Sequence, residues 1–149
     1  MQIDVRLATA QDRKALDQFY AREGKDFQNL TARSISSPVG AIAETMFVIA
    51  VAGDMIVASL KLDVGNDPRM GRVGFIKYFE IEDELEQTDL GTQMIAKTIE
   101  IAERKGLGAL DTMVPESRQD VIGVFGGSGF EEQCREVHLR RLFRTSVFQ

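Results

Sequence analysis

The stretch from Gly71 to Gly106 constrains the fold of this chain more than any other part of its sequence. It begins with a run of alternating character at residues 72–81, which is typical of a half-buried β-strand. An acidic loop follows, and an amphipathic helix then extends over residues 89–105 before Gly106 ends it. The core-facing residues of this helix recur every three or four positions: Leu90, Met94, Thr98, Ile101 and Ala102. A strand that leads through a turn into a helix N-terminus is a common phosphate-binding arrangement, because the first helical N–H groups have no partner within the helix.

Weaker signals along the rest of the chain complete the predicted order of elements. A strand at 3–7 precedes a helix that begins at Thr9, because Asp12 three residues later completes a capping-box-like pattern. The later segments are a poorly defined helix near 27–35, a hairpin of strands 46–52 and 55–64, a turn at 65–68, a strand at 107–114, a short helix at 118–125, and a strand or hairpin at 130–143. The predicted order is β-α-(α)-β-β-β-α-β-α-β(-β), a mixed α/β fold in a single domain over residues 1–149. A helix crosses over between strands 72–81 and 107–114, so these two strands are expected to be parallel.

The composition argues against several classes of function. No apolar run reaches the roughly 18 residues of a membrane span, and no signal peptide is visible, so no membrane partner is expected. Cys134 is the only cysteine, which leaves no intramolecular disulfide and favours a cytoplasmic location. With His138 as the only histidine, no zinc site of a common kind is expected, and no metal is predicted. The net charge of −5 argues against nucleic acid and suits a basic amine or a protein amino group.

Three features together resemble the GNAT superfamily, the Gcn5-related N-acetyltransferases: the strand at 73–81, the turn that closes at Leu90-Gly91-Thr92, and the pair Gly129-Phe130. The resemblance in element order covers nearly the whole chain, with segment 25–45 in the place of the family's variable substrate-side segment. It implies acetyl-CoA as the co-substrate and a direct transfer of the acetyl group to an amine of a small molecule or a protein. No Ser-His-Asp or Cys-His arrangement suggests a covalent enzyme intermediate.

The first family signature lies between the central strand and its helix. Family members carry Arg or Gln, two variable residues, Gly, one variable residue, and then Gly or Ala. When the last glycine is aligned with Gly91, Glu86 stands at the Arg or Gln position and Asp89 at the first Gly position. Gln87 fits the Arg or Gln position if the loop slips by one residue. The resemblance implies that the strand end binds the pantetheine arm and the loop binds the pyrophosphate, through Ile81, Gln87, Thr88, Asp89, Leu90, Gly91 and Thr92.

The loop before this helix is strongly acidic. From residue 80 to residue 89 it has six acids and no lysine or arginine: Glu80, Glu82, Asp83, Glu84, Glu86 and Asp89. Carboxylates stabilise a helix N-terminus by about 0.3–1 kcal/mol each, which explains them without any ligand. The same charges oppose a bound pyrophosphate. A catalytically inactive GNAT-fold protein that serves as a binding or regulatory module is therefore the alternative.

The second family signature is an aromatic residue, usually Tyr, five residues before a Gly-Phe pair, with Asn seven residues before the aromatic. Here Phe125 stands at the Tyr position and Arg118 at the Asn position. The resemblance places Phe125 beside the cofactor. It also implies that the family's tyrosine often protonates the leaving thiolate, and Phe125 has no proton to give. This replacement also favours the inactive alternative.

Glu80 and Tyr78 are the candidate catalytic residues, because both lie near the end of the predicted central strand. Glu80 would take a proton from the amine, although a solvent-facing strand residue is the alternative. Tyr78 lies on the same face if the strand has no bulge, and would replace the missing tyrosine as the acid. A half-buried sheet tyrosine is the alternative for Tyr78. Lys77 would reach a phosphate or lie on the surface, and Asp111 would face the site or the polar side of its strand.

The C-terminal segment is basic, with Arg135, Arg140, Arg141 and Arg144. These arginines would lie on a solvated strand face or meet the acidic loop of a second subunit. Because an exposed last strand can pair with another chain, a homodimer is a candidate assembly.

Overall fold

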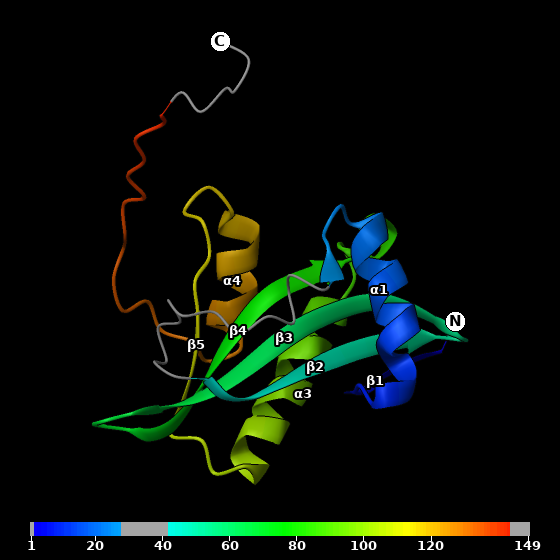
Figure 1. Ribbon diagram of the computed structural model, residues 1–149, viewed down its shortest axis with the longest axis horizontal. Helices are drawn as coiled ribbons and strands as arrows, with labels where there is room; N and C mark the ends of the chain where they lie inside the picture. The colour runs from blue at the N-terminus through cyan, green and yellow to red at the C-terminus, as the bar shows by residue number, and fades with distance from the viewer. Residues whose placement is uncertain (1, 28–41, 144–149) are drawn as a thin grey trace.

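The computed structural model describes residues 2–27 and 42–143 (Figure 1). Its centre is a five-stranded sheet whose strands lie side by side in chain order: β1 (Ile3–Leu7), β2 (Ile42–Ala52), β3 (Met55–Asp67), β4 (Gly71–Ile81) and β5 (Ala109–Thr112). Strands β1 to β4 are antiparallel to their neighbours, and β5 is parallel to β4. The parallel pair predicted on the two sides of the crossover helix is therefore confirmed.

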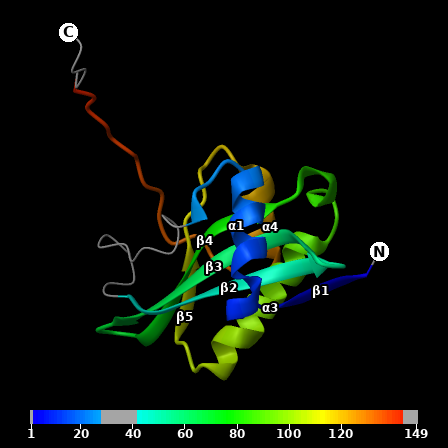
Figure 2. The ribbon, with the colours of Figure 1, turned by 45° about the vertical axis from the view of Figure 1, so that its right-hand side comes forward.

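In the described part of the chain, three α-helices cover the two faces of the sheet (Figure 1, Figure 2). Helix α1 (Arg13–Arg22) packs on one face, and α3 (Leu90–Arg104) and α4 (Gln119–Gly127) pack on the other. Neighbouring residues of a strand point to opposite faces, so Ile49 packs with α1 and Ala50 with α3. β3 lies in the middle of the sheet and is buried along the whole range 56–65.

Helix α3 confirms the amphipathic helix that the sequence predicts. Its buried residues form one stripe towards the sheet: Leu90, Met94, Ile95, Thr98, Ile101 and Ala102. Gly106 follows with a φ of 70°, a left-handed conformation that glycine adopts without steric cost, and the helix ends there. Helix α4 continues two residues beyond the predicted end, and it is Gly129, with a φ of 95°, that takes the left-handed position after it.

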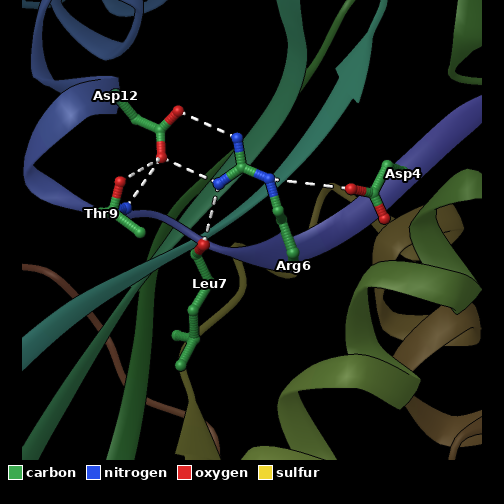
Figure 3. Close-up of polar contacts among 5 residues, drawn as sticks. All are labelled: Asp4, Arg6, Leu7, Thr9 and Asp12. Atoms are coloured by element: carbon green, nitrogen blue, oxygen red, sulfur yellow. Dashed lines mark hydrogen bonds and ion pairs between the residues drawn. The ribbon is translucent and has the colours of Figure 1, made fainter.

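Polar contacts hold the connection from β1 to α1 (Figure 3). Arg6 donates from Nη1 and Nη2 to the two carboxylate oxygens of Asp12, at 2.8 and 3.0 Å, and from Nη1 to the Leu7 carbonyl oxygen at 3.0 Å. The Thr9 N–H donates to Asp12 Oδ2 at 2.7 Å. The predicted helix start at Thr9 is confirmed, as a 3-10 turn that leads into α1. The hydrogen bonds from Arg6 and then from Thr9 hold the pKa of Asp12 well below its usual range.

The C-terminal segment does not form the predicted strand or hairpin. From Phe130 to Phe143 the chain has no regular secondary structure, and nearly all of its residues are exposed. A β-strand needs a hydrogen-bonded neighbour, and among the described residues no strand lies beside this segment. The prediction of a strand here was therefore wrong for the single chain.

Some boundaries also differ from the prediction. β3 continues to Asp67, so the chain turns later than expected. Asp67 Oδ1 accepts hydrogen bonds from the N–H groups of Arg69 and Met70, at 2.7 and 3.1 Å, and closes the turn. β5 is shorter than the predicted strand 107–114. The helix expected near 27–35 lies outside the described residues apart from Phe27, which is buried.

Candidate active site

Strand β4 contains a bulge near its end. One β3 residue, Leu60, faces two β4 residues, Tyr78 and Phe79, so β4 has an extra residue at this point. Tyr78 has a φ of 51° and is the only non-glycine residue of the described chain with a positive φ. A bulky L-residue is strained in this conformation, and such strain is concentrated at functional sites. The condition for Tyr78 and Glu80 to share a face, an unbulged strand, is therefore not met.

The buried hydroxyl of Tyr20 on α1 holds the bulge. It donates to the Tyr78 carbonyl oxygen at 3.0 Å and lies 2.9 Å from the Ser59 hydroxyl, which can donate to it in turn. Tyr20 is fully buried, and this burial raises the pKa of its phenol. The hydroxyl therefore stays protonated near neutral pH and remains a donor to the strained peptide.

Strands β4 and β5 are paired over only part of their length. Residues 73–76 of β4 pair with residues 109–112 of β5, and the Thr112 hydroxyl donates to the Ile76 carbonyl oxygen at 3.1 Å. Beyond Ile76, no described residue of β5 pairs with β4. The sheet therefore does not use the backbone groups on the β5 side of residues 77–81, and they can bind a ligand.

The N-terminus of α3 lies against this end of β4. A Cβ placed on Gly91 would be 3.5 Å from Ile81 Cδ1 and 3.9 Å from Val124 Cγ1. These are ordinary van der Waals separations, and the φ of Gly91 is not positive, so the fold would accept alanine at this position. A longer side chain would extend into the space beside the unpaired end of β4.

Three side chains of the predicted pyrophosphate loop contribute to the fold. Leu90 is buried in the core. Thr88 Oγ1 donates to the Leu85 carbonyl oxygen at 2.6 Å and accepts from the Leu90 N–H at 3.3 Å. Asp89 Oδ2 accepts from Gln93 Nε2 at 3.0 Å. Of the three, only Thr88 accepts a backbone N–H at the start of α3. The predicted contact of these residues with a pyrophosphate stays a prediction.

The remaining residues of the predicted cofactor set gather where α3 begins. The side chains of Gln87 and Thr92 are exposed. The N–H groups of Gly91 and Thr92 belong to the first turn of α3, where an α-helix provides no internal partner. The structure therefore brings Ile81 and these two N–H groups together. The acids of the preceding loop stabilise the helix end and oppose an anion there.

Phe125 packs inside the fold. It is buried, and its ring makes edge contacts with those of Phe79 and Phe130, with centroids 6.1 and 5.1 Å apart. Because Phe79 is one of the bulge residues, Phe125 fixes α4 against the bulge. Its contact with a cofactor stays a prediction. Arg118, at the position of the family's Asn, forms an ion pair with Asp120 at 3.3 Å on the surface.

Glu80 lies in an acidic environment beside α1. Its side chain is half-buried and forms an ion pair with Lys25 Nζ at 2.8 Å. Burial raises the pKa of the neighbouring Glu23, and the charges of Glu80, Asp83 and Glu82 raise it further. Glu80, Glu82 and Asp83 thus act electrostatically on Glu23, while Arg22 pairs with Glu82 at 3.9 Å.

Tyr78 is partly exposed, at 36%. Its ring lies over the ammonium of Lys61, whose Nζ is 5.8 Å from the ring centroid. The catalytic roles of Tyr78 and Glu80 stay predictions.

A buried charged cluster lies on the α1 face of β3, and it was not predicted from the sequence. Lys61 Nζ is 3.3 Å from Asp63 Oδ1, which also accepts the Thr45 hydroxyl at 2.8 Å, and both charged residues are buried. Asp63 Oδ2 has no hydrogen-bond partner among residues 2–27 and 42–143, and it lies 4.0 Å from Lys77 Nζ. The only signal was the alternation of Lys61 and Asp63 with leucines, which is also typical of a strand with a solvated face. Lys77, which was expected near a phosphate or at the surface, therefore belongs to this cluster.

The other polar candidates do not gather at the bulge. Asp111 is on the exposed side of β5, and His138 is exposed in the C-terminal segment. Within residues 2–27 and 42–143, no group of three His, Cys, Asp or Glu side chains is placed to hold a metal ion. In the same ranges, no helix is long and apolar enough to cross a membrane.

Solved structures of acetyltransferases have the same architecture. The aminoglycoside acetyltransferase meta-AAC0020 from an uncultured soil metagenomic sample, in complex with trehalose, matches with a TM-score of 0.73 and 12% identity, over 95% of this chain and 97% of that chain. The aminoglycoside N-acetyltransferase AAC(6')-Iy in complex with CoA matches with a TM-score of 0.70 and 17% identity, over 94% of this chain and 100% of that chain. This chain has the GNAT fold.

A protein described as a transcriptional regulator has a similar structure. A transcriptional regulator from Bacillus halodurans C-125 matches with a TM-score of 0.71 and 15% identity, over 94% of this chain and 100% of that chain. No protein-family model matches the amino-acid sequence, and a comparison with curated proteins gives no match. At these identities the similarity concerns the GNAT fold, and a fold does not establish an activity by itself.

Proposed function

We propose that this protein is an acetyl-CoA-dependent N-acetyltransferase that transfers an acetyl group directly to an amine of a small molecule or a protein. The observation that supports this most is the bulge at Tyr78, after which β4 is unpaired beside the N-terminus of α3. Unused backbone groups along β4 suit the amides of a pantetheine arm, and the first N–H groups of α3 suit a pyrophosphate. AAC(6')-Iy, which shares the GNAT fold, was solved with CoA bound, and this supports the same use of the fold here.

The residues present fit acetyl-CoA in shape and oppose it in charge. Gly91 has no side chain in the space beside Ile81, so a ligand can approach the backbone there. The acids between residues 80 and 89 repel the pyrophosphate. Backbone N–H donors do not depend on the side chains that surround them. We therefore expect the acidic loop to weaken binding and not to abolish it.

Acetyl-CoA supplies an acetyl group that is activated as a thioester. When the amine nitrogen forms its bond to the carbonyl carbon, the bond from that carbon to sulfur breaks and the amine loses a proton. Glu80 is the proposed base, directly or through a water molecule, because it lies at the bulge with its carboxylate half-buried. Tyr78 is the proposed acid for the leaving thiolate. Most of the rate would come from holding the two substrates together.

A cationic amine is the proposed acceptor. The carboxylates beside the bulge, Glu23, Glu80, Glu82 and Asp83, are close enough to raise the pKa of Glu23. An incoming ammonium group would be attracted to them and would replace Lys25 as the partner of Glu80. Glu80 would then hold the proton that the acceptor loses.

A catalytically inactive GNAT-fold module for binding or regulation is the second candidate. Phe125 is buried and has no hydroxyl at the position of the family's tyrosine, and one matching structure is described as a transcriptional regulator. Such a protein would bind a ligand at the same place and would not release CoA from acetyl-CoA.

Calorimetric titration of acetyl-CoA tests the cofactor site directly. We expect binding in the micromolar range. Gly91→Glu should abolish it, because a carboxylate would occupy the space beside Ile81. Gly91→Ala is the matched control and should retain binding, since its methyl group fits at 3.5 Å. Absence of heat and of thermal stabilisation at millimolar acetyl-CoA would contradict the proposal.

Turnover separates the two candidates. Release of CoA in the presence of a panel of amines, with cationic amines fastest, would support the acetyltransferase. Binding without turnover across the panel would support the inactive module. A cytoplasmic location and a homodimer also remain proposals, because they rest on the sequence alone.

A further inference from the structure

The bulge in β4 changes which of its side chains share a face of the sheet. Lys77 and Glu80 are three residues apart, so in a regular strand they would point to opposite faces. The bulge adds one residue between them, and Lys77 is therefore paired with Lys61 of β3. Glu80 is paired with Ser59, which is two residues from Lys61 and on the same face. Because paired residues lie on one face, Lys77 and Glu80 also share it.

Contacts of both side chains agree with this placement. Lys77 Nζ lies 4.0 Å from Asp63 Oδ2, on the α1 face of β3. Glu80 forms its ion pair with Lys25, which follows α1, at 2.8 Å. Because their β3 partners are two residues apart, the backbone positions of Lys77 and Glu80 are about 7 Å apart. A cation and a carboxylate thus lie near each other on the α1 face, on the two sides of the bulge.

Lys77 has an ammonium group that the fold leaves available to a ligand. Its side chain is 18% exposed, so part of it is open to solvent. Within residues 2–27 and 42–143, Asp63 is the only carboxylate that forms an ion pair with Lys77, and their distance of 4.0 Å is too long for a hydrogen bond. The ammonium also lies 5.5 Å from the centroid of the Phe75 ring, a contact that uses no hydrogen bond.

The cluster around Asp63 has an excess of positive charge. Lys61 and Lys77 both pair with this carboxylate, so the ion pairs of the described chain join two cations to one anion. The side chain of Lys61 is only 2% exposed, and charges removed from water are costly unless they are paired. One more negative charge would balance the cluster. A carboxylate therefore fits Lys77 better than a doubly charged phosphate.

We propose that the acceptor is a free α-amino acid, whose ammonium binds Glu80 and whose carboxylate binds Lys77. This assignment rests on the proposed acetyltransferase function. The nitrogen and a carboxylate oxygen of an α-amino acid are about 3 Å apart, and a hydrogen bond of about 2.8 Å at each end gives a span of roughly 8–9 Å. The long side chains of Lys77 and Glu80 can match this span. The amino group of a protein N-terminus has no carboxylate beside it, and such an acceptor would leave Lys77 without its ligand.

The transfer step is the one proposed for any amine at this site. The ammonium gives one proton to Glu80, and the free amine becomes the nucleophile. Its nitrogen bonds to the acetyl carbon, and the bond from that carbon to sulfur breaks. The second proton that the nitrogen loses replaces the one that Tyr78 gives to the thiolate. The product is an N-acetylated amino acid, which keeps its carboxylate and has lost its positive charge.

Matched pairs of acceptors test the carboxylate subsite. Each α-amino acid is compared with its α-carboxamide, which keeps the amine and the side chain and lacks the negative charge. With acetyl-CoA, kcat/KM should be at least about 10-fold higher for the acids, because a charge-assisted hydrogen bond is lost in the amides. Amides that react as fast as the acids would overturn the proposal and would leave the acetyltransferase function standing.

Variants of Lys77 test which residue causes the preference. Lys77→Met should make the rates for acids and amides equal, whereas Lys77→Arg keeps a positive charge and should keep most of the preference. Lys97→Met on α3, which also breaks an ion pair, is the matched control and should leave the preference unchanged. If Lys77→Met lowered kcat/KM equally for acids and amides, Lys77 would only support the fold, and the proposal would be wrong.

Calorimetry with the reaction products needs no turnover. With CoA present, an N-acetylated amino acid should bind at least about 10-fold more tightly than its amide, and Lys77→Met should remove the difference. This result without CoA release from acetyl-CoA in any pair would support the carboxylate subsite and contradict the proposed activity. Equal affinities for the acid and the amide in the wild type would overturn the subsite.

Discussion

The two faces of strand β3 differ in the residues that they bury. Towards α3 the central strands present apolar side chains, such as Val48, Leu60 and Leu62. Towards α1, β3 carries a buried polar row that ends beside the bulge: Ser59, Lys61 and Asp63. Apolar burial stabilises the first face at no electrostatic cost, whereas buried polar groups stabilise a fold only when they are paired. Departures from an apolar core are expected where a protein has a function, and this one lies next to the proposed active site.

Removal of Asp63 should have the largest effect on stability. Asp63→Ala should lower the free energy of unfolding by about 3–5 kcal/mol, because Lys61 would remain buried without its carboxylate partner. Urea denaturation measures this, and Lys61→Met with Asp63→Leu should restore most of the loss because both charges are gone. Leu60→Ala gives the corresponding value for the apolar face, about 2–5 kcal/mol. If Asp63→Ala lowered the free energy of unfolding by less than about 1 kcal/mol, buried Lys61 would not depend on its carboxylate partner. The stated difference between the polar row and the apolar face would then be wrong.

Removal of the proposed base should slow turnover without weakening acetyl-CoA binding. Glu80→Gln should lower kcat by roughly 100- to 10,000-fold, the usual contribution of a general base, and should not weaken acetyl-CoA binding, since it removes one of the charges that repel the pyrophosphate. Steady-state kinetics and calorimetry measure the two quantities. The control is Glu100→Gln on α3, which also changes an ion-paired carboxylate. It should leave kcat and the acetyl-CoA dissociation constant unchanged. Equal losses in the two variants would remove Glu80 from the mechanism.

The Tyr20 hydroxyl should matter more than a buried hydroxyl on the other face. Tyr20→Phe should lower the free energy of unfolding by about 1–3 kcal/mol and weaken acetyl-CoA binding, because the Tyr78 carbonyl loses its donor. Thr98→Val is the matched change on α3, where the hydroxyl donates only to the Met94 carbonyl of its own helix. It should leave acetyl-CoA binding unchanged. If calorimetry showed the same affinity in both variants, the bulge would not depend on Tyr20 for its binding geometry.

The smallest effect is expected where α1 joins the sheet. The folded-state pKa of Asp12 is depressed, so its contacts stabilise the fold above the unfolded pKa of about 4, and this stabilisation is lost as the pH falls below that value. Asp12→Asn should therefore lower the free energy of unfolding by about 1 kcal/mol near neutral pH. The difference in this free energy between variant and wild type should become smaller in acid. Thermal unfolding over a pH series measures it. Asp4→Asn, which weakens only a longer contact to Arg6 of 3.7 Å, is the control and should change little. A stability difference that became larger in acid would contradict the depressed pKa of Asp12.

Much of the fold could be predicted because its signals are local. The stripe from Leu90 to Ala102, the capping pattern at Thr9 and the crossover to a parallel β5 were all predicted from residues close together in sequence. The candidate site was predicted less completely. Ile81 and Gly91 do lie together, but the Lys61–Asp63 pair was missed, because a polar residue in a strand is compatible with either a solvated or a covered face.

The sequence by itself determined the unit from β4 through α3 to β5, since periodicity, turn residues and helix ends act over a few residues. Only the tertiary structure decided the conformation of Tyr78, because the hydroxyl that holds its carbonyl belongs to Tyr20, distant in the chain. It also decided that Lys61 and Asp63 are buried, because their burial depends on residues distant in the chain such as Thr45 and Lys77. The C-terminal segment shows the same limit, since its alternating pattern forms no strand where no described strand lies beside it.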